Sequence, residues 1–140
     1  MLCEESAPGK AGLLNLPGCG FDREQDRVVL NCATREAREE GGDDLIVRAI
    51  GGLGIYEYPN PDRHRLHLVF ASVVESGEPS PSKEHPWAGY ASFAQITKWD
   101  EEGRLRNPAV RRSIDFYRRG MIIPLEQFLT TVFEDKLRKI

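Results

Sequence analysis

Residues 27–40 are expected to form the first helix of this chain, because they contain neither proline nor glycine and carry a single helical stripe of apolar side chains. The apolar residues recur at helical spacings: Val28, Val29, Cys32, Ala33 and Ala37. The glycine pair 41–42 follows directly and is typical of a helix stop. The sequence therefore predicts one early helix over 27–40.

Short apolar runs separated by turn residues surround this helix. The predicted strands are 11–16, 45–50, 53–58, 66–74 and 88–92, and the later helices are a turn at 93–99 and two longer helices at 108–119 and 125–138. A Pro-Asn-Pro-Asp turn at 59–62 predicts a hairpin between two of the strands. This order of elements predicts a layered α/β fold of the α+β kind, and 140 residues suit one domain.

Composition narrows the function classes. Twenty-two acidic and 19 basic side chains give a net charge of −3, without the basic excess that a nucleic-acid duplex requires. No apolar run is long enough to cross a membrane. Three cysteines without paired spacing predict neither a disulfide framework nor a zinc site. We therefore expect a cytoplasmic protein that binds neither duplexes nor membranes.

Three glutamates crowd the end of the predicted helix. Glu36 lies three residues before Glu39 and four before Glu40, so their β-carbons lie about 5–6 Å apart. The last two fall where the helix dipole disfavours a carboxylate by about 0.3–1 kcal/mol each. Either this face is merely solvated, with Arg35 and Arg38 neutralising its carboxylates, or it binds a hard divalent cation. The helix alone leaves both interpretations open.

A glycine-rich turn precedes the helix and completes a longer motif. The turn reads Leu-Pro-Gly-Cys-Gly at 16–20, and the helix ends in Arg-Glu-Ala-Arg-Glu-Glu-Gly-Gly at 35–42. Together they resemble the Nudix box, in which a glycine, five residues, a glutamate and seven residues precede Arg-Glu-(apolar)-x-Glu-Glu-x-Gly-(apolar). The resemblance implies a Nudix fold, with a mixed sheet sandwiched between helices, in one domain over 1–140 whose box spans about 18–42.

The first half of the motif departs from the family pattern. Cys19 replaces the second glycine of the usual Pro-Gly-Gly, and Leu14 replaces a tryptophan. Asp26 stands at the first glutamate, and eight residues instead of seven separate it from Arg35, as in a one-residue insertion. Asp43 replaces the closing apolar residue. The half with the three glutamates is intact, and we expect Asp26 to have a structural role in its loop.

The resemblance implies roles for individual residues. Glu36, Glu39 and Glu40 match the glutamates that hold Mg²⁺ or Mn²⁺, and one of them can also act as general base. Arg35 matches the arginine that orients a glutamate by a charge-assisted hydrogen bond. Gly18 matches the glycine whose carbonyl completes the metal shell.

The loop after the hairpin supplies a further candidate. Glu84 occupies a position where many Nudix relatives carry a catalytic or metal-binding glutamate, and the alternative is an ordinary exposed loop residue. The three histidines, His64, His67 and His85, match no metal-ligand spacing, so surface or strand-packing roles are predicted for them.

Two functions follow from the resemblance. The first is metal-dependent hydrolysis of a phosphoanhydride bond in a nucleoside diphosphate linked to another moiety, with a small nucleotide as substrate. The alternative is a Nudix-fold nucleotide-binding or regulatory module with weakened catalysis, favoured by the altered first half of the box.

The two ends of the chain raise separate expectations. Residues 1–3 read as the end of a strand, which predicts a truncated amino-terminal strand. The predicted helix at 125–138 carries a continuous apolar stripe, so it packs either on its own domain or on a second subunit in a homodimer.

Overall fold

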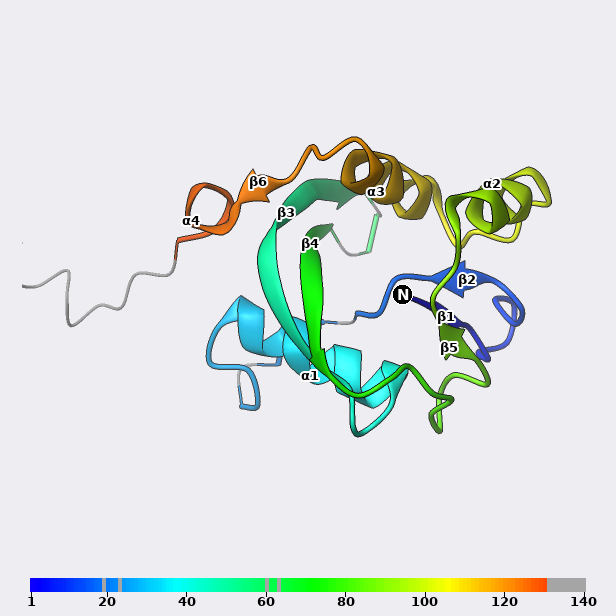
Figure 1. The fold of residues 1–140 in the computed structure, drawn as a ribbon, viewed down its shortest axis with the longest axis horizontal. Helices are drawn as coiled ribbons and strands as arrows, with labels where there is room; N and C mark the ends of the chain where they lie inside the picture. Colours follow the sequence, from blue (N-terminus) through cyan, green and yellow to red (C-terminus); the bar gives the residue numbers. More distant parts are fainter. Residues whose placement is uncertain (19, 23, 60, 63, 131–140) are drawn as a thin grey trace, which may run out of the picture.

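The computed structural model describes residues 1–18, 20–22, 24–59, 61–62 and 64–130, and it has an α+β architecture (Figure 1). The strands are β1 (Leu2–Glu4), β2 (Leu14–Asn15), β3 (Ile46–Tyr58), β4 (Arg65–Ser76), β5 (Ala88–Gly89) and β6 (Ile123–Pro124). The helices are α1 (Val29–Gly41), α2 (Phe93–Glu101), α3 (Pro108–Arg118) and α4 (Leu125–Phe128).

The strands of the described residues form two antiparallel sheets of three strands each. Their orders are β4-β3-β6 and β2-β1-β5, and parallel pairing enters through an isolated bridge between Leu14 and Leu105. In Figure 1, α1 crosses the lower part of the long β3–β4 hairpin and α3 lies at its upper end, so helices flank the larger sheet. The predicted layered α+β fold is confirmed.

Strand β3 joins two strands that the sequence predicted as separate. The predicted break at Gly51 and Gly52 is instead a pair of register shifts against β4, one between Ala49 and Gly51 and one between Gly52 and Gly54. Bulges of this kind accommodate glycine without ending the ladder, since the backbone bends locally and pairing resumes. The prediction of a hairpin was correct, and Tyr56 lies opposite His67 within it.

The glycine pair also lets the carboxyl-terminal elements lie against β3. A β-carbon at Gly52 would lie 2.1 Å from Cγ of Phe128, and one at Gly51 would lie 2.5 Å from the Ile123 carbonyl oxygen. The Phe128 ring also meets the Phe70 ring edge-on, with centroids 5.4 Å apart. The missing side chains therefore make room for β6 and α4.

Replacing Gly52 with valine is expected to lower the free energy of unfolding by about 1–3 kcal/mol, because the new side chain overlaps the Phe128 ring. Urea denaturation measures the change. Gly20→Ala is the matched control, since nothing lies within 4 Å of a β-carbon there. Adding Phe128→Ala should restore part of the loss; a Gly52→Val protein as stable as the parent would contradict this packing.

A hydrophobic core packs against the small sheet. Leu2, Leu14, Ile96 and Val110 are buried together, and they come from β1, β2, α2 and α3. This packing, with the pairing of β1 to both β2 and β5, fixes the segment before β5 beside the amino-terminal strand. The strand predicted at residues 1–3 is β1, its truncation stays a prediction, and the loop before β5 carries part of the candidate site.

Local capping explains where two later helices begin. Ser92 and Gln95 form a capping box at the start of α2, and the Asn107 side chain accepts from the Ala109 and Val110 amides at the start of α3. The helix predicted at 108–119 is confirmed by α3. No helix among the described residues is long and apolar enough to cross a bilayer.

Within the described residues, the helix predicted at 125–138 is only the short helix α4. Helix α4 ends at Phe128, because Leu129 has extended backbone angles of φ −145° and ψ 123°. Residues 131–138 of the predicted helix lie outside the described residues. The contacts of Phe128 place α4 against its own sheet, and the homodimer stays a prediction.

Candidate functional site

Helix α1 separates its three glutamates by burial. Glu36 and Glu40 are one helical turn apart and only 4% and 8% exposed, so both lie on the buried face of the helix. The Glu39 side chain lies off that face and is 53% exposed. The structure therefore buries two like charges where the sequence predicted one cluster of three.

Arg35 binds the first two of these glutamates, Glu36 and Glu39. Its Nη1 donates to Glu36 and to Glu39, the latter at 2.8 Å. Its Nε and Nη2 donate to the two carboxylate oxygens of Asp26 at 2.9 and 2.8 Å. One guanidinium thus bridges three carboxylates, and the orienting role that the sequence resemblance implies for Arg35 stays a prediction.

Asp26 anchors the loop before α1. It is 1% exposed, and besides Arg35 it accepts a hydrogen bond from the Asp22 amide. The Arg35 hydrogen bonds lower the pKa of Asp26 to about 2, against the opposing effect of burial. The structural role predicted for Asp26 matches these contacts, even though aspartate replaces the family's glutamate and one residue is inserted after it.

Asp26→Asn is expected to be less stable than the parent at neutral pH, because asparagine cannot pair with the guanidinium as an anion. A carboxyl whose pKa is lowered by folding stabilises the native state above its usual pKa of 3.8 and stops doing so as pH falls toward 2. The stability difference should therefore shrink between about pH 4 and pH 2, measured by thermal melts. The exposed Asp43→Asn is the control; a constant difference across this range would contradict the assignment.

Glu40 points away from Arg35 and toward the small sheet. Its Oε2 accepts from the Gly18 amide at 2.9 Å, and its Oε1 lies 3.4 Å from Nε2 of His85. Burial raises the pKa of Glu40 to about 7; the Gly18 amide and His85 oppose this rise, and the Glu36 carboxylate adds to it. Folding thus buries a carboxylate that is costly to ionise without a cation.

Gly18 meets the site through its amide in this structure, whereas the sequence resemblance implied a role for its carbonyl. The amide contact still brings the glycine-rich turn to the end of α1, as the motif requires. Cys19, predicted to be a tolerated glycine replacement, lies outside the described residues.

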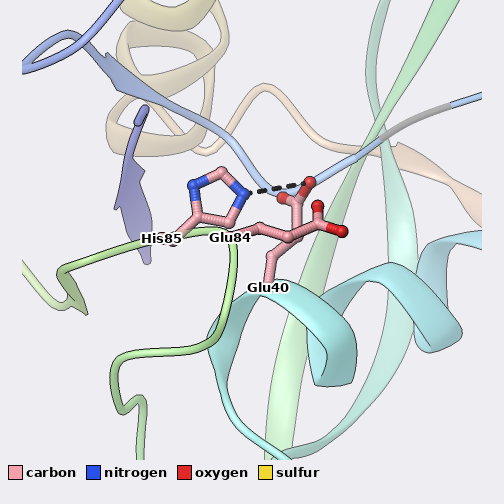
Figure 2. Close-up of side chains that lie close together, drawn as sticks. All are labelled: Glu40, Glu84 and His85. Atoms are coloured by element: carbon pink, nitrogen blue, oxygen red, sulfur yellow. Dashed lines mark ion pairs between the residues drawn. The ribbon is translucent and has the colours of Figure 1, made fainter. Parts of the chain in front are cut away.

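His85 and Glu84 approach Glu40 from the loop before β5 (Figure 2). The three residues each offer a ligand atom, and these atoms lie within 4.8 Å of one another. His85 is 6% exposed, while Glu84 is exposed. Among the residues that the structure describes, Glu40, Glu84 and His85 thus form a group of three that could hold a metal ion. The metal set Glu36, Glu39 and Glu40 stays a prediction.

The sequence predicts a surface or strand-packing role for His85, whereas the structure buries this residue beside Glu40. Its place next to the candidate Glu84, in the Glu-His-Pro-Trp loop at 84–87, is the available clue in the sequence. What the sequence lacks is the pairing of β1 with β5, which carries this loop across to the end of α1. His64, by contrast, lies on the surface beside Glu57.

An open hollow of about 450 Å³ lies against α1. Its lining consists of Asn31, Thr34, Arg35, Arg38, Glu39 and Asp43. Two guanidinium groups and the exposed Glu39 carboxylate therefore face one space, where a phosphate group and a cation could be held together.

Comparison with solved structures identifies the fold. A Nudix hydrolase from Nitrosomonas europaea aligns with a TM-score of 0.74 and 24% sequence identity, over 94% of this chain and 86% of that chain. The chain has the Nudix fold. No family model matches the sequence, and a search of curated proteins gives no significant match. At this identity the likeness shows the fold alone, so any chemistry of this Nudix-fold chain has to be argued from its own residues.

Proposed function

We propose that this protein hydrolyses a phosphoanhydride bond in a nucleoside diphosphate linked to another moiety, with Mg²⁺ or Mn²⁺. The observation that carries the proposal is the burial of Glu36 and Glu40 at the carboxyl-terminal end of α1, with the glycine-rich turn held against Glu40. Two buried carboxylates at the negative end of a helix dipole call for positive charge.

Arg35 supplies that charge for Glu36 but not for Glu40. In the described part of the chain, the side-chain partners of Glu40 are the Gly18 amide and His85. A divalent cation that is itself bound to phosphate oxygens would compensate such a carboxylate. The ligand atoms that the three glutamates offer are carboxylate oxygens, which suit Mg²⁺ and Mn²⁺.

The proposed roles follow the positions of the side chains. Glu36, Glu39 and Glu40 would hold the ion, with the Gly18 carbonyl completing its shell. A bound ion would neutralise charge on the diphosphate oxygens and lower the pKa of the attacking water.

The remaining residues would position the glutamates and accept a proton from the attacking water. Arg35 positions Glu36 and Glu39, and its hydrogen bond to Oε2 of Glu39 leaves that residue's Oε1 for another ligand. Either a box glutamate or the exposed Glu84 would accept the proton from water. The hollow beside Glu39 is a place for the substrate diphosphate.

A binding or regulatory module is the second candidate, and one observation favours it. Arg35 already neutralises Glu36 and Glu39, two of the three glutamates assigned to the ion. A protein of this kind would bind a nucleotide without turnover.

A substrate panel separates the two functions. Nucleoside triphosphates, ADP-ribose, dinucleoside polyphosphates and nucleotide sugars are each incubated with Mg²⁺ or Mn²⁺, and released phosphate products are measured. We expect hydrolysis of at least one compound, abolished by a chelator. Nucleotide binding without turnover of any compound would favour the binding module.

A further inference from the structure

His85 is held in the orientation of a metal ligand. Its Nδ1 lies 2.8 Å from the Glu4 carbonyl oxygen, and because that oxygen only accepts, Nδ1 is the protonated ring nitrogen. The backbone of Glu4 is itself fixed, since its amide donates to the Trp87 carbonyl. A histidine that donates one ring N–H to a backbone carbonyl while its other nitrogen faces carboxylates is the usual arrangement around a protein-bound transition metal.

Glu40 is oriented in a matching way. The Gly18 amide occupies Oε2, so Oε1 is the oxygen that faces Nε2 of His85, at 3.4 Å. Ligand atoms about 2.1 Å from a tetrahedral ion lie about 3.4 Å apart. The 3.4 Å between Nε2 of His85 and Oε1 of Glu40 thus equals the distance expected between two ligand atoms of one metal ion.

Burial makes this pair unusual. Glu40 and His85 are only 8% and 6% exposed, and Nε2 of the imidazole lies 3.4 Å from a carboxylate oxygen of Glu40. Two buried acceptors that face each other need a positive centre between them, either a proton or a metal ion.

Glu84 completes the set from the solvent side. Its carboxylate lies within the same 4.8 Å group, and Figure 2 shows it beside that of Glu40. The side chain is exposed and free of the packing that fixes its neighbours, so a bond rotation can bring its oxygen to ligand distance, while the hydrogen bond from Ser6 to its carbonyl holds the backbone.

We propose that Glu40, Glu84 and His85 form a mixed oxygen-and-nitrogen site that binds a divalent transition-metal ion in preference to Mg²⁺. Imidazole suits the later first-row ions and zinc, whereas Mg²⁺ takes oxygen ligands. The site shares Glu40 with the proposed hydrolytic metal set, but metal binding by this site does not require hydrolysis.

Cobalt binding tests the site without any substrate. CoCl₂ is titrated into the purified full chain while the visible absorption of Co²⁺ is followed, and Mg²⁺ affinity is measured separately by calorimetry. His85→Gln is expected to weaken Co²⁺ binding by about 100-fold or more, since even a group that only orients a ligand contributes about 10–100-fold. Mg²⁺ affinity should change less than about 3-fold, because Mg²⁺ does not use the imidazole.

Two further variants complete the test. His64→Gln removes an exposed histidine beside Glu57 and should leave Co²⁺ affinity unchanged. Glu84→Gln alters an exposed side chain, so it stays folded even if His85→Gln does not, and it should also weaken Co²⁺ binding. Parental Co²⁺ affinity in His85→Gln, or in Glu84→Gln if the histidine variant is unfolded, would overturn the site and leave a structural contact between His85 and Glu40.

The result can be read independently of the proposed function. Loss of Co²⁺ binding in these variants supports the site whether or not the substrate panel gives turnover. Turnover with Mg²⁺ in a protein that fails to bind Co²⁺ would keep the hydrolase and remove the mixed site.

Discussion

Glu40→Gln is expected to lower turnover by more than about 100-fold on any substrate that the parent protein hydrolyses. The buried carboxylate is proposed to hold the catalytic ion, and metal stabilisation of the transition state contributes several kcal/mol, each 1.4 kcal/mol of which is a factor of ten in rate. Glutamine has the same shape and its carbonyl oxygen can still accept from the Gly18 amide, so the turn should keep its place. Steady-state kinetics with saturating Mg²⁺ measure the loss.

Stability distinguishes this effect from unfolding. Folding raises the pKa of Glu40 from 4.5 to about 7. The free energy of unfolding of the parent protein should therefore fall as pH rises from about 4.5 to 7, and it should stay lowered above pH 7. Without metal at pH 8, Glu40→Gln should therefore be at least as stable as the parent. Glu101→Gln, at an exposed position on α2, is the control. Unchanged turnover in Glu40→Gln would remove the metal assignment.

Arg35→Lys is expected to lower kcat by about 10–100-fold, the range measured when a group that orients metal ligands is lost. Lysine keeps the positive charge but lacks the fork that contacts Asp26, Glu36 and Glu39 at once. The variant should also melt at a lower temperature, because the buried Asp26 carboxylate loses its two-point contact. KM for the nucleotide should change little if Arg35 acts through the glutamates.

Arg48→Lys provides the control. Arg48 lies on β3, and its exposed side chain donates from Nε to Glu75 at 2.7 Å and does not line the hollow beside Glu39, so its loss should affect neither kcat nor the Mg²⁺ affinity. An Arg35→Lys protein with parental kcat and a lower melting temperature would mean that Arg35 serves the fold alone.

Local sequence patterns correctly predicted the helices and the hairpin whose formation depends on residues within one segment. Helix α1 follows from the apolar stripe at 27–40 and the glycines behind it, and α3 follows from the Asn-Pro start at 107–108. The hairpin follows from its turn residues. The predicted break at Gly51–Gly52 was wrong. Whether glycine ends a strand or continues it depends on the residues packed against it, and here β6 and Phe128 lie where side chains at these positions would be.

In the candidate site too, contacts within one segment could be predicted and contacts between distant segments could not. Spacing on one helix predicted one group of Glu36, Glu39 and Glu40, whereas the structure buries Glu36 and Glu40 and leaves Glu39 exposed. The motif predicted a hydrogen bond from Arg35 to a glutamate, and Arg35 donates to Glu36 and Glu39. It did not predict that Arg35 would hold two of them while Glu40 turned to His85. Which partner a carboxylate meets depends on packing between segments, and no local spacing encodes that.

The early acidic helix, the glycine turn before it and the resemblance to the Nudix box can all be read from neighbouring residues. The position of the loop at 84–85 at the end of α1 cannot, because it depends on the pairing of the amino-terminal strand with β5. Burial and the pairing of distant strands set the surroundings of Glu40. A buried carboxylate faces a histidine 45 residues away in the chain, and its need for a cation arises from its burial.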